Sequence, residues 1–239
     1  MKGMIPAFRF LTRLPMPSAT VVDADFTLSM RWFPMVGAAI GVMVAGGCRL
    51  GALVDPWTGA MVGLLVWVLV TGALHLDGLS DLADAGGAAH QDRERLLAVL
   101  ADPHVGSFGV VAIALQLIAK LVLLHASIAQ GFFGPLILVP FAARAGVLAW
   151  TYWLPPLHQG LAWRFRSAVR PIDLALWTLV LIASAWFAPT LLIAPFLIAL
   201  WGWWLRRTIG GISGDGHGAG IELVETGLLI GLAVAGAMA

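Results

Sequence analysis

The sequence predicts an all-α, polytopic integral membrane protein: a bundle of about seven transmembrane helices preceded by an N-terminal amphipathic helix. Hydrophobic residues make up 60% of its 239 residues, and charged residues only 11%. Soluble domains carry about 45–50% apolar and about 25% charged residues. A soluble chain of this composition would expose far too much hydrocarbon to stay dispersed. The length allows one membrane-embedded domain, residues 1–239.

Seven runs are candidate spans, because a helix needs about 20 mostly apolar residues to cross a bilayer. They cover residues 32–53, 56–74, 107–127, 132–154, 172–188, 190–205 and 221–238. Asp55-Pro56 predicts a tight turn between the first two, and Pro189 lies in the short connection of a helical hairpin between the fifth and sixth. The sixth run is short, and the seventh carries Glu222 and Glu225 near its start.

Basic residues fall on one predicted side of the membrane. With the N-terminus inside, the inside segments are 1–31, 75–106, 155–171 and 206–220, and they hold eleven of the fourteen Lys and Arg residues. These eleven are Lys2, Arg9, Arg13, Arg31, Arg93, Arg95, Arg164, Arg166, Arg170, Arg206 and Arg207. Such a bias is typical of cytoplasmic loops. The chain is therefore expected in the cell inner membrane, with its N-terminus and polar segments on the cytoplasmic side.

Three aspartates follow directly on the second apolar run, in "HLDGLSDLADAGG", residues 75–87. Asp77, Asp81 and Asp84 are spaced by four and three, so on a helix they project within about 60° of one another. Like charges at these spacings destabilise a helix, and a hard divalent cation, Mg²⁺ or Mn²⁺, would offset the repulsion. The alternative is a solvated helix start, where the helix dipole attracts aspartates.

A second acidic pair lies in the glycine-rich stretch "GGISGDGHGAGIELVE", residues 210–225. Asp215 and Glu222 share a face if the chain is helical from Gly216 onward. With the three aspartates they would form a five-carboxylate cytoplasmic cup, in which two Mg²⁺ ions could grip a diphosphate. Asp215 could equally be a turn residue or a helix N-cap. Asp102 either joins the cup or caps the next helix.

Several cations could complete a phosphate site, although those near span ends could equally be positive-inside anchors. Lys120 and Arg144 differ because they lie inside predicted spans, where a cation faces a polar cavity or a charged partner. The formal net charge of +1 provides no basic excess for binding nucleic acid. The candidate phosphate contacts outside the spans are Arg9, Arg13, Arg93, Arg95, His104 and His217.

Six blocks together resemble one known family. In order along nearly the whole chain, they are "FRFLTRLPMP" at 8–17, "FPMVG" at 33–37, "HLDGLSDLADAGG" at 75–87, Arg93 to Leu97, "DPHVGSFGVVAIALQLIAK" at 102–120, and "RRTIGGISGDGHGAGIELVE" at 206–225. This combination resembles the cobalamin synthase family, the adenosylcobinamide-GDP ribazoletransferases.

The resemblance implies Mg²⁺-dependent transfer of the adenosylcobinamide phosphate group from adenosylcobinamide-GDP to α-ribazole or its 5′-phosphate, with release of GMP. The implied catalytic residues are Asp77, Asp81, Asp84 and Glu222, and Asp102 and Asp215 join these four as metal ligands. The implied substrate contacts are Arg9, Arg13, His75, Arg93, Arg95, His104, Ser107, Lys120, Arg144 and Arg207. The lipid bilayer, a second copy of the chain and other cobalamin-pathway enzymes are further candidate partners.

Two loops depart from the family pattern. Pro103-His104 stands where the family commonly has Ser-Arg, and Gly216-His217 stands where it commonly has Thr-Leu. His104 would replace the arginine only as a weaker donor, because histidine is neutral over much of the pH range. All the acidic positions are intact.

Two other functions stay open from sequence. A CDP-alcohol phosphatidyltransferase also uses clustered helical aspartates with Mg²⁺, but its Ala-Arg pair is missing after Asp77-Gly78. A metal or cation transporter would account for Lys120, Arg144 and the glycine-rich segments. The acids lie near predicted span ends rather than at the midplane, which disfavours transport.

Overall fold

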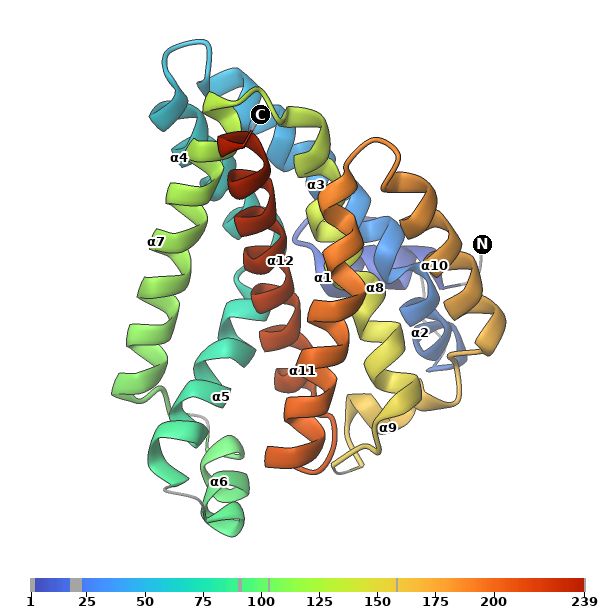
Figure 1. The fold of residues 1–239 in the computed structure, drawn as a ribbon. Coiled ribbons are helices and arrows are strands. Elements are labelled where there is room, and N and C mark those ends of the chain that lie inside the picture. Colours follow the sequence, from blue (N-terminus) through green and yellow to red (C-terminus); the bar gives the residue numbers. More distant parts are fainter. Residues whose placement is uncertain (1–2, 18–22, 90–91, 103, 158, 239) are drawn as a thin grey trace.

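The chain forms a bundle of helices (Figure 1). The computed structural model describes residues 3–17, 23–89, 92–102, 104–157 and 159–238, so Lys2 and Pro103 lie outside the described part. The helices are α1 (Met4–Leu11), α2 (Asp23–Thr27), η1 (Leu28–Trp32), α3 (Phe33–Gly51), α4 (Pro56–Thr71), α5 (Leu74–Ala89), α6 (Arg93–Leu100), α7 (Ser107–Ala129), α8 (Phe133–Trp153), α9 (Leu161–Arg166), α10 (Pro171–Ser184), η2 (Pro189–Ile193), α11 (Ala194–Thr208) and α12 (Gly214–Ala237).

Five helical segments are long and apolar enough to cross a membrane: Asp25–Gly51, Ser107–Ala129, Phe133–Trp153, Pro189–Thr208 and Gly214–Ala237. The pair α4 and α5 passes the same test only as one bent unit, and α10 is a shorter apolar helix of 14 residues. The predicted polytopic helical membrane bundle is confirmed. The count of seven is not, because these criteria give five spans, or six with the bent pair, among the described residues.

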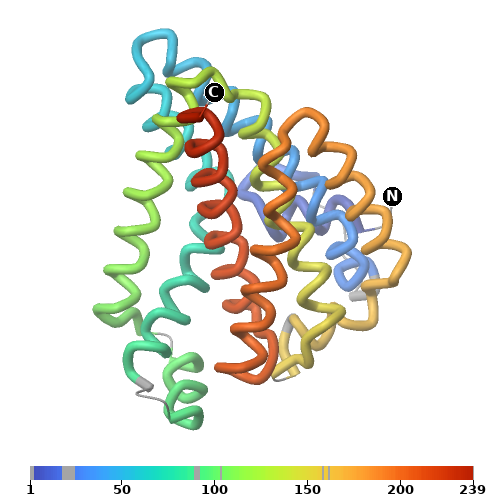
Figure 2. The backbone as a smooth tube through the Cα atoms, viewed as in Figure 1, coloured from blue at the N-terminus to red at the C-terminus, as the bar shows by residue number. Residues whose placement is uncertain are grey.

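The helix α12 is the centre of the bundle, in contact with α5, α7, α8 and α11 (Figures 1 and 2). The neighbouring α3 packs along both α4 and α8. One end of the bundle carries α6, α9 and the end of α11, and the other end carries the C-terminus and the connection from α3 to α4. The end of α5 and the start of α12 lie toward the end of the bundle that carries α6, whereas α1 lies about midway along the bundle.

The bend between α4 and α5 amounts to 86° and lies at Gly72-Ala73. Both residues have left-handed backbone conformations, with φ of 61° and 60°. Glycine adopts this conformation readily, whereas alanine does so at a cost of about 1–2 kcal/mol. The backbone N–H of Arg13 donates to the Val70 carbonyl at 2.7 Å, so the N-terminal segment braces the bend. The second predicted span therefore ends at Thr71, and α5 takes a new direction.

The last predicted span also begins elsewhere. It was expected at residue 221 after a glycine-rich loop, but α12 is one helix from Gly214. The Ser213 hydroxyl caps it by accepting from the Gly216 N–H at 3.0 Å. Glycine inside a helix costs up to about 1 kcal/mol relative to alanine, so the tight packing of these glycines against neighbouring helices must offset that cost.

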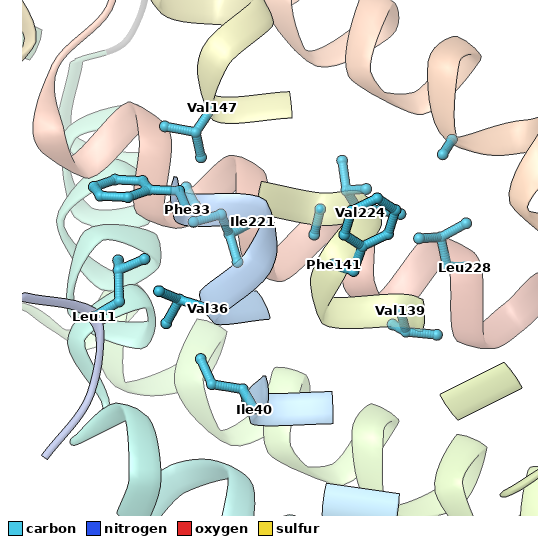
Figure 3. Close-up of a cluster of buried hydrophobic side chains, with 14 of the residues drawn as sticks. Leu11, Phe33, Val36, Ile40, Val139, Phe141, Val147, Ile221, Val224 and Leu228 are labelled. Atoms are coloured by element: carbon cyan, nitrogen blue, oxygen red, sulfur yellow. The ribbon is translucent and has the colours of Figure 1, made fainter. Parts of the chain in front are cut away.

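Small residues and apolar side chains hold the bundle together. A methyl group at Gly37 or Gly41 in α3 would collide with backbone carbonyls of Pro140 or Ile137 in α8. This close approach resembles the small-residue helix contacts of membrane proteins, where packing replaces the hydrophobic driving force. Figure 3 shows the apolar cluster that fills the interior, with Ile221 of α12 beside Phe33 of α3.

The N-terminal helix α1 is amphipathic as predicted, with Ala7 and Leu11 buried and Arg9 exposed. The segment that follows is tethered at Arg31. Its Nε donates to the Ala168 carbonyl at 2.6 Å and lies 3.2 Å from Asp173 Oδ2. The N-terminal segment is thereby fixed against the segment joining α9 to α10.

Candidate active site

Two helices far apart in sequence, α5 and α12, meet at glycines. A methyl group at Gly78 would lie 2.8 Å from the Asp215 Cα atom, and one at Gly218 would lie 3.2 Å from the His75 carbonyl oxygen. The two backbones can approach this closely because neither glycine carries a side chain. Asp77 is therefore brought next to Asp215.

Asp81 lies within electrostatic range of three other aspartates. It is partly buried, and the negative charges of Asp77, Asp215 and Asp84 all act on it. Asp215 of α12 therefore lies within electrostatic range of the aspartates of α5, although more than 130 residues separate them in sequence. We call Asp77, Asp81 and Asp215 the acidic cluster.

The acidic cluster fits a hard divalent cation only as an incomplete site. Among the described residues, no three His, Cys, Asp or Glu side chains stand close enough to form a metal site by themselves. Mg²⁺ is usually held by one or two carboxylates, and substrate phosphates and water complete its octahedron. A set of carboxylate oxygens suits such a site and does not suit a soft metal ion, and the single thiol, Cys48, is buried in α3.

Asp84 uses both of its carboxylate oxygens in contacts with the backbone, and its predicted role as a metal ligand stays a prediction. One of its carboxylate oxygens accepts the Gly106 N–H at 2.7 Å, and the other accepts the Gly109 N–H at 2.9 Å. These are donors of the first turn of α7, which the Gly106 N-cap cannot satisfy with a side chain. The buried Asp84 carboxylate therefore anchors α7 to α5.

Asp102 is also apart from the acidic cluster. It is exposed and pairs with His104 at 2.6 Å between Oδ1 and Nδ1. Asp102 was predicted as a metal ligand and His104 as a phosphate contact. In the structure, a carboxylate oxygen of Asp102 and a ring nitrogen of His104 instead contact each other.

A buried ion-pair network joins α7, α8 and α12. Lys120 Nζ lies 2.7 Å from Glu222 Oε2 and 2.6 Å from Glu225 Oε2. Arg144 Nη1 lies 2.8 Å from Glu225 Oε1, and Gln116 Nε2 donates to Glu222 Oε2 at 2.8 Å. The four charged side chains are at most 5% exposed. Lys120 and Arg144 thus have the charged partners expected of cations inside a span, and Glu222 belongs with them to a neutral, internally paired group.

Glu225 is the residue that the sequence predictions missed. It is fully buried and bridges both intramembrane cations. Lys120 and Arg144 could have indicated it, because a cation inside a span requires a charged partner and Glu225 is a carboxylate in another predicted span. Glu225 follows Glu222 by three residues, so the two carboxylates lie on neighbouring positions of one helix face.

His75 connects this network to the acidic cluster. Arg144 Nη2 lies 3.4 Å from His75 Nδ1, and a guanidinium can only donate. Nδ1 therefore accepts, and the ring proton is on Nε2. His75 is only 4% exposed, and within the described part of the chain its Nε2 has no hydrogen-bond partner.

A cavity of about 160 Å³ opens beside the acidic cluster. Asp77, Asp215, His75 and His217 line its polar side. The rest of the lining is apolar and comes from α1, η1, α3, α5, α8, α9 and α12. Of the substrate contacts predicted from the family resemblance, His75 is the one found in this lining.

The remaining predicted substrate contacts lie outside this cavity. Arg93 Nε donates to the Ile209 carbonyl at 3.1 Å, and the Arg207 guanidinium lies 4.9 Å from the Trp203 ring centroid. Arg13 packs against Gly72 at the bend. Arg9, Arg95, His104 and Ser107 are exposed. Their contacts with substrate stay predictions.

His217 is inside α12 and not in a loop, which corrects the sequence prediction. Its Nε2 lies 2.9 Å from the Thr151 hydroxyl, and its ring is buried. The physical reason is the helical course of the glycine segment, which turns residue 217 toward α8.

The helical bundle and its cavity define a class: a polytopic membrane protein with an acidic site at the junction of a bent helix pair and a central helix. The model of the cobalamin-5-phosphate synthase family matches residues 3–233. The chain belongs to this family and is an enzyme of the transferase class.

Curated relatives match over nearly the full chain. An adenosylcobinamide-GDP ribazoletransferase from Novosphingobium aromaticivorans is 67% identical over 240 residues, covering 99% of this chain and 98% of the relative. Relatives with the same name from Laribacter hongkongensis and Thiobacillus denitrificans are 50% and 45% identical, each covering 96% of this chain and respectively 96% and 94% of the relative. No solved structure matches.

Proposed function

We propose that the protein transfers the adenosylcobinamide phosphate group from adenosylcobinamide-GDP to α-ribazole or α-ribazole 5′-phosphate. An acceptor hydroxyl attacks the cobinamide-linked phosphorus, the bond to the GMP oxygen breaks, and GMP leaves. The observation that carries this proposal is the acidic cluster beside a cavity, in a chain 67% identical to a relative of that name.

Each residue of the site has a distinct part in this proposal. Asp77, Asp81 and Asp215 would hold Mg²⁺, which supplies charge neutralisation on the diphosphate. The Nε2–H of His75 donates to a phosphate oxygen, and Arg144 keeps the ring in the required tautomer. A carboxylate of the acidic cluster takes the proton of the attacking hydroxyl. Phosphoryl transfer depends mainly on such positioning and electrostatics.

The decisive experiment uses the purified protein in detergent with adenosylcobinamide-GDP and α-ribazole 5′-phosphate. We expect GMP and adenosylcobalamin 5′-phosphate in equal amounts, loss of both with EDTA, and recovery with Mg²⁺ or Mn²⁺. Absence of GMP at saturating Mg²⁺ with either acceptor would refute the proposal. Metal-independent turnover would refute the role given to the acidic cluster.

We further propose that the protein lies in the cell inner membrane with its N-terminus and active site in the cytoplasm. The basic segments support this orientation. A cysteine introduced as Ala88→Cys is expected to react with an impermeant maleimide in inverted vesicles and not in intact cells. The natural Cys48 is fully buried and does not interfere. Labelling in intact cells would invert the orientation. Association with a second copy or with pathway enzymes stays a prediction.

The Gly78→Ala variant is expected to lose activity by about 100-fold, because its methyl group would meet the α12 backbone 2.8 Å away. Moving the two helices apart by about 1 Å separates Asp77 from Asp215, and such misplacement typically costs that factor. Steady-state turnover measures the effect.

Gly86→Ala is the matched control for Gly78→Ala. It makes the same change in the same helix, where the added methyl group has nothing within 4 Å. We expect wild-type turnover from it. Equal activity of the two variants would contradict the requirement for close approach of α5 and α12.

A further inference from the structure

The apolar side of the cavity is built largely from aromatic rings. Phe10, Phe33 and Phe165 line it, and we call these three residues the aromatic wall. Phe10 and Phe33 are stacked with ring centroids 5.9 Å apart. The Phe165 ring packs edge-on to both, at 6.2 Å from Phe10 and 5.9 Å from Phe33. A fourth ring, Phe26, supports the wall from 5.3 Å beyond Phe165.

The aromatic wall is assembled from three segments distant in sequence, α1, α3 and α9. Phe33 and Phe165 are each 2% exposed, so the wall is internal. Protein interiors normally close on such rings at high density. Here a cavity persists between the rings and the acidic cluster, and Figure 3 shows Leu11, Phe33, Val147 and Ile221 around this region.

The chemistry of this side restricts what can enter. Its other lining side chains, such as Leu11, Met30 and Val147, carry no hydrogen-bonding group. A guanine or another purine rich in donors and acceptors would lose hydrogen bonds to water without replacement, which is costly. A volume of about 160 Å³ is below the range of roughly 300–1,000 Å³ for whole drug-sized ligands, so only part of a substrate enters. A corrinoid ring is too large.

We propose that the aromatic wall binds the fused aromatic base of the acceptor nucleotide. This inference rests on the proposed function, which supplies an α-ribazole acceptor. The base of α-ribazole is a benzimidazole ring, which has few polar atoms. This ring stacks against Phe10 or Phe33, and the attached ribose is directed toward Asp77 and Asp215. The acceptor hydroxyl then faces the acidic cluster, beside which the proposed function places the diphosphate. The aromatic wall thereby favours acceptors whose base is aromatic and poor in polar groups.

The test uses full-length Phe10→Leu and Phe165→Leu variants, which keep an apolar side chain and remove the ring. We expect the KM for α-ribazole 5′-phosphate to rise about 3- to 10-fold, because an aromatic pair contributes that factor beyond its buried area. The KM for adenosylcobinamide-GDP should stay within about 2-fold. Equilibrium dialysis of α-ribazole 5′-phosphate against the purified variants should show the same weakening without turnover.

Phe141→Leu is the matched control. Phe141 is 3% exposed and packs edge-on to Trp177 at 6.0 Å in α8, outside the cavity lining. This variant is expected to change neither KM.

A second measurement compares acceptors carrying benzimidazole or adenine as the base, and the Leu variants at the wall should discriminate less between them than the wild type does.

The outcomes separate the subsite from the function. A wild-type protein that is inactive with both substrates refutes the proposed function. An active wild type whose wall variants keep the acceptor KM and the base preference refutes the subsite alone. Equal increases in the KM of donor and acceptor also refute it. If the wall variants change only the way in which activity depends on added lipid, the cavity holds a lipid acyl chain. That result overturns the proposal.

Discussion

Asp81→Asn is expected to lower turnover by about 100- to 1,000-fold while the protein still inserts into the membrane. Asp77→Asn and Asp215→Asn should have comparable effects. Asparagine preserves size but removes the charge, and the loss of one preorganised electrostatic group at a reacting centre costs this factor. Asp81 is the most informative position because all three other carboxylates act on it. Turnover at saturating Mg²⁺ is the first measurement.

Binding of Mn²⁺ gives a second measurement that does not depend on turnover. Electron paramagnetic resonance of free Mn²⁺, titrated with protein and GDP, should show weaker binding by each of the three variants than by the wild type. Asp102→Asn makes the same change at an exposed residue paired with His104, and it should match the wild type in both assays. Wild-type turnover in two of the three cluster variants would disprove the acidic cluster as the metal site.

Asp84→Asn should behave differently from these three. Asparagine retains one of the two acceptor oxygens that bind the Gly106 and Gly109 N–H groups. Its main effect is therefore expected on the stability of the contact between α5 and α7, and activity per folded molecule should fall less than in the Asp81→Asn variant.

Hydropathy was sufficient to predict most of the bundle. The runs at 107–127 and 132–154 became α7 (Ser107–Ala129) and α8 (Phe133–Trp153), because a long, mostly apolar segment can satisfy its backbone hydrogen bonds in lipid by forming a helix. The break at Gly72-Ala73 was not predictable in the same way. Ala73 has a left-handed conformation that alanine rarely adopts, so its residue type gives no signal for a bend.

The acidic site was predictable in composition and only partly in membership. Helical spacing correctly places Asp77 and Asp81 near each other. It gives the direction in which each side chain projects from the helix axis, but it does not show how far apart the side chains lie along that axis. Asp84 lies two turns beyond Asp77, and Glu222 two turns beyond Asp215, which is about 10 Å along the axis in each case. One metal ion with ligands at roughly 2.0–2.6 Å cannot span that separation, so the predicted carboxylates could be shared only between two ions. The fold then supplies closer partners for both residues.

The pairing of charges within the membrane depends on which helix faces approach each other. Arg144 and Glu225 are 81 residues apart, and nothing local in the sequence joins them. Only the packing of α8 against α12 makes them partners. From the sequence we could predict that an intramembrane cation needs an anionic partner. The structure shows that Glu225 is the partner of Arg144.

Lys120→Met is expected to destabilise the protein by about 3–5 kcal/mol, since breaking a buried ion pair on one side leaves an uncompensated charge. Two carboxylates, Glu222 and Glu225, would then share the single cation Arg144. The methionine also replaces a cation that lies 4.3 Å from the Trp67 ring centroid. Thermal unfolding in detergent, followed by circular dichroism, measures the loss.

The double variant Lys120→Met/Glu222→Gln tests the cause of that loss. It removes one charge of each sign, and Arg144 and Glu225 still balance each other. The amide oxygen introduced at position 222 can still accept the amide N–H of Gln116. We expect the double variant to recover at least half of the Tm lost in Lys120→Met, whereas His104→Ala at the exposed Asp102 pair should leave Tm unchanged. A double variant no more stable than Lys120→Met would mean that packing around the lysine stem, rather than charge balance, holds α7 against α12.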